Sequence, residues 1–296
     1  MIRDFINSLN IECYCDVSLK KYNTYRLDVK VKYLVLPSDK DDLRKLFKYL
    51  VSNDIKYIVL GNGSNVIFKS DYYDGVVILL NKFKNIEFNE LEVEVDAGYS
   101  LSKLAIEVSK KGFSGLEFAA GIPGFVGASV AMNAGAYNRS LSEVVDRVLL
   151  LDKDFNFVWF KNKELDFSYR DSFLKKNKDF IVVSVVFKLE IGDSEELMDK
   201  IEKRREKRVM SQPLEYPSAG SVFRNPDGMY AGELIEKCGL KGKKINGAMI
   251  SEKHANFIVN TGGASGSDIV SLIELVRERV KEKFGVLLVL EQIIVD

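Results

Sequence analysis

A short stretch between Glu215 and Pro226 carries polar side chains in a setting unlike a helix or a strand. Pro217 and Pro226 stiffen its two ends, because proline fixes φ and lacks a backbone donor. Gly220 permits a positive φ or a close backbone approach directly before Ser221. A hydroxyl held in a rigid loop can donate a proton, because proton transfer requires fixed geometry. The alternative is an ordinary Pro/Gly/Ser connection between domains.

Two glycine-rich stretches contain residue types that suit phosphate or planar ligands. The first, Gly61-Asn62-Gly63-Ser64-Asn65, follows a predicted strand at Tyr57–Leu60. Its small residues expose backbone N–H groups that can surround phosphate oxygens, and a hairpin turn is the alternative. The pattern is not GxGxxG, because the strand-like Val66–Phe68 follows in place of a helix. A nicotinamide Rossmann domain is therefore disfavoured.

The second stretch, residues 121–137, consists almost entirely of small residues. A surface linker of this kind would be more polar and would lack its Val, Ile, Phe and Met. The composition favours backbone lying flat against a large planar ligand, and packing of backbone on backbone in a core is the alternative. The sequence of the stretch is Gly121-Ile122-Pro123-Gly124-Phe125-Val126-Gly127-Ala128-Ser129-Val130-Ala131-Met132-Asn133-Ala134-Gly135-Ala136-Tyr137.

Further charged or titratable side chains are candidates for a site. Arg170 lies among aromatic residues and either packs against them or clamps an anion. The basic cluster 203–208 is either a solvated helix face or a collector of diphosphate oxygens. The lone His254 is either structural or a ligand contact. Glu291, in an apolar strand, either faces solvent or is buried with a raised pKa.

The elements that must position these residues follow from hydrophobic periodicity and capping residues. Residues 1–22 predict a short helix and a polar lead-in. Helices are expected after Ser38, after Ser100, after Ser194, around 231–238, and after Ser267 as far as Gly285. Strands are expected at 29–36, 57–60, 66–68, 75–80, 86–88, 91–95, 144–151, 155–160, 181–189 and 286–295.

The bulk composition indicates an ordinary globular protein of two or three domains. The chain has 296 residues, of which 46% are hydrophobic, and 43 basic residues balance 43 acidic ones. The chain therefore has no net positive charge that would attract nucleic acid or an anionic membrane. The three cysteines suit neither a disulfide framework nor a zinc site, and no metal site is expected. No secretory pattern or membrane-length apolar run occurs, which predicts a cytoplasmic protein.

The motifs taken together resemble those of the UDP-N-acetylenolpyruvoylglucosamine reductase (MurB) family. Each motif alone is weak, but the ordered set is specific and runs from about Asn23 to Glu291, nearly the whole chain. The motifs are Gly61–Asn65, Gly121–Gly124, Ser168–Asp171, Gln212–Ser221, Lys253–Phe257 and Phe284–Val286.

The resemblance implies an α+β protein with an FAD-binding fold of the vanillyl-alcohol-oxidase/PCMH type. That fold has two α+β subdomains, and a third α+β domain binds the substrate. The implied limits are residues 1–191 for the FAD-binding part, with its core at about 26–191, and 192–284 for the substrate-binding domain. A C-terminal strand, 285–296, returns to the FAD-binding part. The length is similar to the family's shorter second type.

The resemblance also implies the reaction. The chain would reduce UDP-N-acetylglucosamine enolpyruvate to UDP-N-acetylmuramate in peptidoglycan precursor synthesis, with non-covalent FAD and with NADPH as co-substrate. Hydride goes to C3 and a proton to C2. Ser221 matches the proton donor, Arg170 the stabilising cation, and Glu291 the carboxylate that acts with Arg170.

The remaining implied roles concern binding. Tyr169, Asn225 and His254 match substrate-side positions, and the expected partner is a UDP-sugar bound by a monomer, without nucleic acid or membrane. The expected cofactor-binding residues are Gly61, Asn62, Gly63, Ser64, Asn65, Gly121, Ile122, Pro123, Gly124, Gly127, Asn133, Gly135, Ala136 and Tyr137.

The chain departs from the family pattern near its C-terminus. Val289 stands where many members have an acidic residue, and Gln292-Ile293-Ile294 replaces the usual basic residue after the glutamate. Two alternatives stay open: another FAD-dependent oxidoreductase of the same fold, and an inactive nucleotide-sugar binding protein. Oxidases of this fold commonly tether flavin through His or Cys, and neither lies near Gly61 or Gly121.

Overall fold

The computed structural model describes residues 2–9 and 11–296, and the chain folds as two compact units. Unit 1 comprises residues 1–15, 33–61 and 75–206, and unit 2 comprises residues 16–32, 62–74 and 207–296. Both units mix helices and strands, which confirms the predicted α+β class. The predicted boundaries at residues 191 and 284 separate a part that binds FAD from a domain that binds the substrate. Because they depend on which ligand each part binds, they stay a prediction.

The helices and strands are as follows. The helices are α1 (Ile2–Ser8), α2 (Lys40–Ser52), α3 (Leu101–Lys110), α4 (Val126–Ala131), α5 (Phe173–Lys176), α6 (Ser194–Ser211), α7 (Ala231–Lys237) and α8 (Gly266–Phe284). Short 3-10 turns are η1 (Leu19–Lys21), η2 (Glu117–Ala119), η3 (Leu141–Glu143) and η4 (Asn162–Glu164). The strands are β1 (Glu12–Ser18), β2 (Lys30–Leu36), β3 (Tyr57–Leu60), β4 (Val66–Phe68), β5 (Tyr72–Leu79), β6 (Ile86–Asn89), β7 (Glu92–Asp96), β8 (Phe113–Ser114), β9 (Gly135–Ala136), β10 (Arg139–Ser140), β11 (Val145–Leu151), β12 (Phe157–Lys161), β13 (Ile181–Lys188), β14 (Glu190–Ile191), β15 (Lys244–Ile245), β16 (Ala248–Ile250), β17 (Ile258–Asn260) and β18 (Ile293–Val295).

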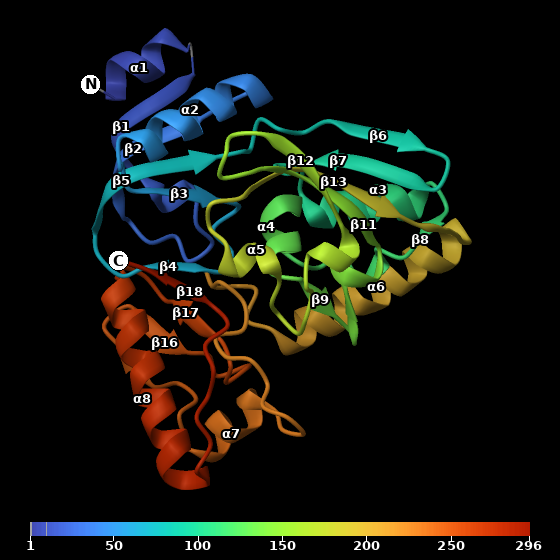
Figure 1. Cartoon of the computed structure of the whole chain (residues 1–296). Helices are drawn as coiled ribbons and strands as arrows, with labels where there is room; N and C mark the ends of the chain where they lie inside the picture. The colour runs from blue at the N-terminus through green and yellow to red at the C-terminus, as the bar shows by residue number, and fades with distance from the viewer. Residues whose placement is uncertain (1, 10) are drawn as a thin grey trace. The chain divides into compact units, whose positions relative to one another are not determined.

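The main sheet of unit 1 has five antiparallel strands in the order β12-β11-β13-β7-β6 (Figure 1). Its central strand, β13, is rich in valine and is buried along almost its whole length. β-branched side chains suit such a strand because they pack well on a pleated surface. A second sheet has the order β1-β2-β5-β3, and within it β3 and β5 are parallel.

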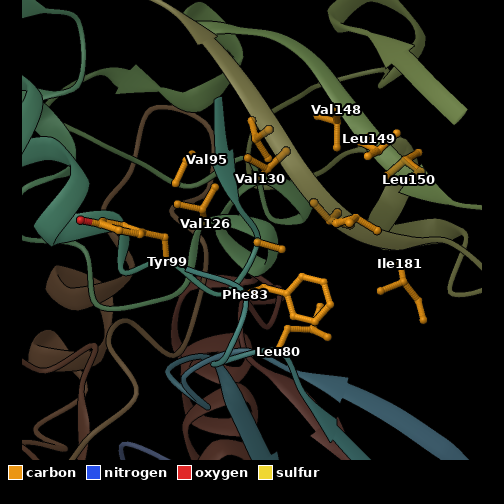
Figure 2. Packing of buried hydrophobic residues seen from close by; sticks show 14 of the residues in the cluster. Leu80, Phe83, Val95, Tyr99, Val126, Val130, Val148, Leu149, Leu150 and Ile181 are labelled. Carbon is orange, nitrogen blue, oxygen red and sulfur yellow. The ribbon is translucent and has the colours of Figure 1, made fainter. Parts of the chain in front are cut away.

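Helix α4, which belongs to the small-residue stretch 121–137, packs against β7 and β13. Its Val126 and Val130 are fully buried and lie beside Val95 of β7 in the core of unit 1 (Figure 2). The short helix therefore holds the glycine-rich stretch against the sheet. Burial of each such side chain contributes roughly 1.5 to 3 kcal/mol to folding.

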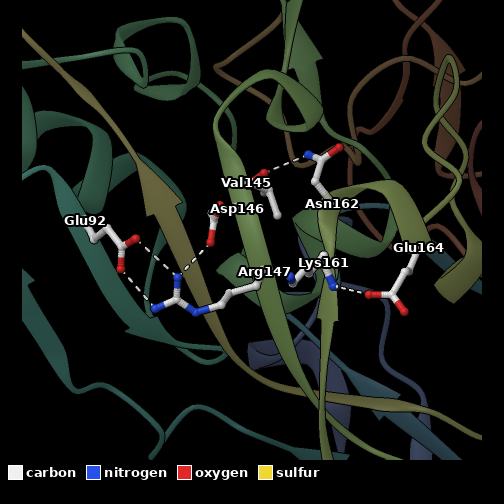
Figure 3. A network of polar contacts seen from close by, with 7 residues as sticks. All are labelled: Glu92, Val145, Asp146, Arg147, Lys161, Asn162 and Glu164. Carbon is white, nitrogen blue, oxygen red and sulfur yellow. Dashed lines mark hydrogen bonds and ion pairs between the residues drawn. The ribbon is translucent and has the colours of Figure 1, made fainter.

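A polar network covers part of the same sheet (Figure 3). The guanidinium of Arg147 on β11 donates to both carboxylate oxygens of Glu92 on β7, at 3.2 and 2.9 Å. These hydrogen bonds raise the pKa of Arg147. Asn162 donates from Nδ2 to the carbonyl oxygens of Ser142 and Val145, at 2.8 and 2.7 Å. The ion pair is about one-third exposed and so contributes little to stability.

Unit 2 is built around α8 and the three-stranded sheet β15-β16-β17 (Figure 1). The apolar spacing of α8 predicts a buried stripe that ends at Phe284. Phe284, in the last turn, is only partly buried, and the first five members are buried: Ile269, Leu272, Ile273, Val276 and Val280. Helix α8 contacts β15 and β16. Strand β18 pairs in parallel with β4, so the end of the chain is tied to residues that directly follow the first glycine-rich stretch.

Several predicted helix caps were one or two residues off. Helix α8 is capped by Ser265, not Ser267, because Ser265 and Asp268 form a reciprocal capping box at 3.1 and 2.9 Å. Helix α2 is capped by Asp39, not Ser38. At α6, the Asp193 carboxylate accepts from the backbone N–H of Glu196, so the cap precedes Ser194. A carboxylate competes well for these positions because it also meets the positive helix end.

Two strand predictions also need correction. The polar lead-in within residues 1–22 contains strand β1, whose Glu, Asp and Ser residues are weak strand formers. The predicted strand 286–295 forms a regular ladder only at Ile293–Val295. Before that, the chain makes one isolated bridge, between Leu290 and Phe223. The composition of residues 286–295 favours an extended chain, but a regular ladder also requires a partner strand along its whole length.

Within the described ranges 2–9 and 11–296, every helix is too short or too polar to cross a membrane.

Candidate functional site

The predicted site residues fall in both units, and each set is described within its own unit. Unit 1 holds Gly61, Gly121, Ile122, Pro123, Gly124, Gly127, Asn133, Gly135, Ala136, Tyr137, Tyr169 and Arg170. Unit 2 holds Asn62, Gly63, Ser64, Asn65, Ser221, Asn225, His254 and Glu291.

The Ser221 loop in unit 2 is fixed by hydrogen bonds at both ends. The carbonyl of Pro217 accepts from the N–H of Asn260 at 2.9 Å, and the N–H of Val222 donates to the carbonyl of Asn256 at 2.9 Å. Gly220 has φ +75°, and a Cβ there would meet no atom within 4 Å. Glycine is thus required for the backbone conformation and not for space. The loop is the rigid mounting that the two prolines predict.

Glu291 lies on a segment paired with the residues that follow Ser221. The N–H of Glu291 donates to the carbonyl of Val222 at 2.8 Å, and the N–H of Arg224 donates to the carbonyl of Val289 at 2.9 Å. Together with the Phe223–Leu290 bridge, these bonds make the two segments antiparallel neighbours. The structure therefore brings the backbones of the predicted proton donor and the predicted carboxylate together.

Asn65, a predicted cofactor-binding residue, also fixes the backbone of Glu291. Its Nδ2 donates to the Glu291 carbonyl at 3.1 Å, and its own carbonyl accepts from the N–H of Ile293 at 2.9 Å. The end of the first glycine-rich stretch therefore supports the segment that carries the predicted carboxylate. Asn65 thus contacts this segment through its side-chain amide and through its own backbone carbonyl, a positional constraint that the sequence motif does not reveal.

A cavity of about 400 Å³ opens beside Ser221, entirely within unit 2. Its size suits part of a nucleotide-sugar. It brings together three residues that the sequence predicts separately, Ser221, Asn225 and His254. The Oδ1 of Asn225 accepts from the N–H of Ala231 at 3.0 Å, which holds this side chain at the start of α7. The lining residues are Ser221, Asn225, Tyr230, Gly232, Glu233, Glu236, Lys253, His254, Ala255 and Asn256.

The ring of His254 is held in one orientation at this cavity. Its Nδ1 accepts from the N–H of Asn256 at 3.2 Å, and its ring contacts Phe257 edge-on with centroids 4.8 Å apart. Burial lowers the pKa of His254 below its ordinary value, so the ring is neutral near pH 7. Because Nδ1 accepts, the ring proton resides on Nε2, which makes that nitrogen a donor.

Asn256 lines the cavity but is not among the residues predicted individually. It is 4% exposed, and its amide donates to the carbonyl of Phe223 at 2.8 Å and accepts from the N–H of Phe223 at 3.0 Å. It thereby satisfies both backbone groups of a residue two positions after Ser221. The only sequence signal for it is its place in the motif Lys253–Phe257.

Arg170 in unit 1 is bonded to the end of the second glycine-rich stretch. Its Nη2 donates to the carbonyl of Gly135 at 2.5 Å, and its Nη1 lies 3.5 Å from the carbonyl of Asn133. The guanidinium lies over the ring of Tyr169, 5.3 Å from its centroid. Arg170 can therefore still either pack against aromatic residues or clamp an anion. It lies on the ring of Tyr169, and the polar contacts also fix the orientation of its guanidinium.

The backbone at Arg170 is left-handed, with φ +56°. This conformation costs a non-glycine residue of order 1 kcal/mol and is retained only where the surroundings enforce it. The turn is closed by reciprocal backbone hydrogen bonds between Ser168 and Asp171, at 3.0 and 3.2 Å. Asn133 reinforces it by donating from Nδ2 to the Ser168 carbonyl at 2.8 Å. These hydrogen bonds hold the turn that presents Arg170 in its left-handed conformation.

The two glycine-rich stretches meet within unit 1. A Cβ on Gly61 would lie 2.7 Å from the Cβ of Ala128, and one on Gly127 would lie 2.8 Å from the Cβ of Ala97. Backbone packing in the core therefore accounts for Gly61 and Gly127. The same contacts place the start of the first stretch against the second. This adjacency fits a single flavin nucleotide bound by both stretches.

The basic cluster 203–208 has one defined contact with the second stretch in unit 1. The guanidinium of Arg204 lies over the ring of Tyr137, 4.8 Å from its centroid, and the Tyr137 hydroxyl donates to the Arg204 carbonyl at 3.1 Å. Other cluster members are on the solvated face, since Lys203 and Arg205 make exposed ion pairs along the helix. The described part of the chain contains no group of three His, Cys, Asp or Glu side chains placed to hold a metal ion.

Comparisons with known proteins agree with this organisation. A family model described as UDP-N-acetylenolpyruvoylglucosamine reductase, C-terminal domain, matches residues 212–295, and an FAD binding domain model matches residues 31–160. UDP-N-acetylenolpyruvoylglucosamine reductase 1 of Bacillus cereus is 43% identical over 269 residues, which covers 90% of this chain and 89% of that protein. The reductase of Caldanaerobacter subterraneus is 41% identical over 92% of this chain and 90% of its own length.

A solved structure extends the match to three dimensions. The crystal structure of UDP-N-acetylenolpyruvylglucosamine reductase (MurB) from Thermus caldophilus superposes with a TM-score of 0.82 at 34% identity. The match covers 97% of this chain and 99% of the Thermus chain. These matches confirm the predicted FAD-binding fold with a separate C-terminal domain. The chain therefore belongs to the UDP-N-acetylenolpyruvoylglucosamine reductase family.

Proposed function

We propose that this chain reduces UDP-N-acetylglucosamine enolpyruvate to UDP-N-acetylmuramate with Ser221 as the proton donor. Family membership makes the chain an FAD-dependent oxidoreductase of peptidoglycan synthesis that uses NADPH as reductant. The observation that carries the residue assignment is in unit 2. Ser221, Asn225 and His254 line one cavity, and the segment of Glu291 is hydrogen-bonded to the residue that follows Ser221.

The chemistry assigns the protein two tasks. Bound FAD, once reduced by NADPH, would supply the hydride that C3 of the enolpyruvyl group accepts. The protein must stabilise the negative charge that then spreads into the substrate carboxylate, and it must deliver a proton to C2. A serine hydroxyl is a poor acid in water, so Ser221 can protonate only a strongly basic carbon held in a fixed position. The hydrogen-bonded loop supports the proposal because it fixes the position of the hydroxyl.

Arg170 and Glu291 are assigned to the developing charge. The guanidinium of Arg170 is already oriented by the carbonyls of Gly135 and Asn133, so little reorganisation accompanies the reaction. Glu291 is half-buried, on a segment that Asn65 fixes from one side and Val222 from the other. We assign Glu291 to share protonation and orientation of the enolate-like carboxylate with Arg170.

Binding roles are assigned to residues around the cavity and along the glycine-rich stretches. Asn225 and His254 would donate hydrogen bonds to sugar or phosphate oxygens, and the exposed ring of Tyr169 would contact the substrate. The backbone of the stretches 61–65 and 121–137 would hold FAD, where Gly61 and Ala128 meet. We further expect a cytoplasmic monomer, which size-exclusion chromatography with light scattering would test.

Turnover of the purified protein tests the proposed reaction. Protein loaded with FAD should consume NADPH only when the enolpyruvyl UDP-sugar is present, and mass spectrometry should identify UDP-N-acetylmuramate as the product. NADPH consumption that proceeds equally well without the sugar would indicate another oxidoreductase of this fold. Absence of consumption under all conditions would point to an inactive nucleotide-sugar binding protein. Either result would contradict the proposal.

A further inference from the structure

Gln292 is a buried amide that contacts the loop preceding and including Ser221. It is 3% exposed, and its Nε2 lies 3.0, 3.3 and 3.4 Å from the carbonyl oxygens of Ala219, Gly220 and Ser221. Carbonyl oxygens only accept hydrogen bonds, so the NH₂ group of the amide must face the loop. Three consecutive peptide planes therefore converge on a single donor group.

Tyr25 holds the other end of this amide. Its hydroxyl donates to Oε1 of Gln292 at 3.0 Å. Tyr25 is fully buried, and burial raises the pKa of its hydroxyl, which therefore keeps its proton and remains a donor. Because Oε1 is engaged by Tyr25, the amide is fixed in the orientation that directs its NH₂ toward the loop.

The same network reaches the start of the loop. The backbone carbonyl of Tyr25 accepts from Nδ2 of Asn260 at 2.8 Å, and the N–H of Asn260 donates to the carbonyl of Pro217 at 2.9 Å. Pro217 and Ser221 are thus tied to each other through Tyr25, Gln292 and Asn260. All of these residues belong to unit 2.

We propose that Gln292, oriented by Tyr25, is a positioning residue that aims the Ser221 hydroxyl for proton delivery. The inference rests on the proposed function, in which Ser221 donates that proton. The three carbonyls bonded to Gln292 set the peptide planes on either side of Gly220 and Ser221, and these planes determine the direction of the Ser221 Cα–Cβ bond. A carboxylate at position 292 would lack the donors, and an aliphatic side chain would lack both donor and acceptor.

The test compares Gln292→Leu and Tyr25→Phe with the wild-type holoenzyme. In Gln292→Leu, oxidation of the reduced flavin by the enolpyruvyl sugar should slow by about 10- to 100-fold, because a small misplacement of a reacting group has effects of that order. Reduction of the flavin by NADPH should be unchanged. The solvent deuterium isotope effect on the sugar step should rise as proton transfer becomes limiting. Tyr25→Phe should give the same pattern, but more weakly, because it removes one hydrogen bond.

Asn162→Leu in unit 1 is the matched control. Asn162 also donates from its amide to backbone carbonyls, that of Val145 (Figure 3) and that of Ser142, and it has no assigned role in catalysis. Its replacement should lower the melting temperature without changing the sugar step or its isotope effect. An equal slowing of the sugar step in this control would show that loss of stability, not positioning, causes the defect, and would overturn the inference.

A double-mutant cycle with Ser221→Ala separates this inference from the proposed function. If Gln292 acts through Ser221, adding Gln292→Leu to Ser221→Ala should slow the sugar step no further. If the double mutant is instead slowed by the product of the two single-mutant factors, the positioning role is overturned. A slow Ser221→Ala variant beside a normal Gln292→Leu variant would overturn the inference and leave Ser221 in place. Unchanged turnover in Ser221→Ala would instead refute the proposed proton donor, and the inference with it.

Tyr25→Phe decides the matter if Gln292→Leu does not fold. This variant keeps the amide and every side-chain volume close to the original. A normal rate and a normal isotope effect in Tyr25→Phe would then overturn the inference, and a slower sugar step with a raised isotope effect would support it.

Discussion

A serine hydroxyl is a weak acid, so the proposed role of Ser221 as proton donor depends on its geometry. Its loop combines a left-handed Gly220 with two backbone hydrogen bonds, one accepted by the carbonyl of Asn256 and one donated by the N–H of Asn260. The neighbouring His254 is fixed by the same segment, because its Nδ1 accepts from the N–H of Asn256. At the scale of single residues, the site is thus assembled mainly by side chains and backbone bonded to backbone.

The titration of His254 should appear in the pH dependence of stability. Burial lowers the pKa of His254 in the folded protein, so the unfolded chain binds the proton first as the pH falls below about 6.5. Stability should therefore decrease between pH about 6.5 and the lower folded-state pKa. Replacing the chain's single histidine by glutamine should flatten this part of the profile. Thermal unfolding followed from pH about 8 to about 5 measures the difference. An identical profile in His254→Gln would contradict the prediction.

At the scale of elements, helix α8 shows what its sequence specifies and what it leaves open. Its apolar spacing predicts the buried stripe, and Gly285 ends it with φ +71° as expected. The sequence around its start contains both Ser265 and Ser267, and either serine suits an N-cap. Only the reciprocal bonds with Asp268 select Ser265. Periodicity therefore specifies the face of the helix, and the cap follows from local geometry.

Replacing the two serines tests this assignment. Ser265→Ala should lower the free energy of unfolding by about 1 kcal/mol, because it removes the cap of α8. Ser267→Ala should have a clearly smaller effect, since it removes only the contact between the two hydroxyls. Urea unfolding of both variants gives the comparison. A larger loss in Ser267→Ala would show that the cap is misassigned.

Some residues of the candidate site are also predictable from the sequence, and others are not. Ser221, Asn225 and His254 are predictable because each belongs to a distinctive motif, and they line one cavity. Gln292 and Tyr25 carry no such signal, because an amide and a phenol bonded to a distant loop depend on tertiary contacts. Strand β13 is predictable from its valines, whereas β1, with weak strand formers, depends on its partner β2.

At the scale of the whole molecule, the family domains and the compact units follow different divisions of the chain. The FAD binding domain model covers residues 31–160, whereas residues 62–74 belong to unit 2 together with the C-terminal part. Strand β4 in that segment pairs with β18, and Asn65 supports Glu291. Residues from the flavin motif thus help build the unit that presents Ser221. A change in the stretch 61–65 should therefore affect both the proposed cofactor binding and the proposed proton-transfer site.

The cofactor should be held without a covalent bond. Neither residues 61–65 nor residues 121–137 contain a histidine or cysteine to which flavin could be attached. Denaturing the purified yellow protein should therefore release all of its FAD into a filtrate, where absorbance and chromatography identify it. Flavin fluorescence that stays with the polypeptide on a denaturing gel would contradict this expectation.

The most direct test of the central claim follows the two halves of the reaction separately in Ser221→Ala. The flavin is first reduced by NADPH, and its absorbance is then followed by stopped flow after the enolpyruvyl UDP-sugar is added. NADPH should reduce the flavin of the variant as fast as that of the wild type, and the sugar should still bind. Reoxidation of the flavin by the sugar should slow by at least about 100-fold, the lower end of typical general-acid contributions. Reoxidation at the wild-type rate would contradict the assignment of Ser221 as the proton donor.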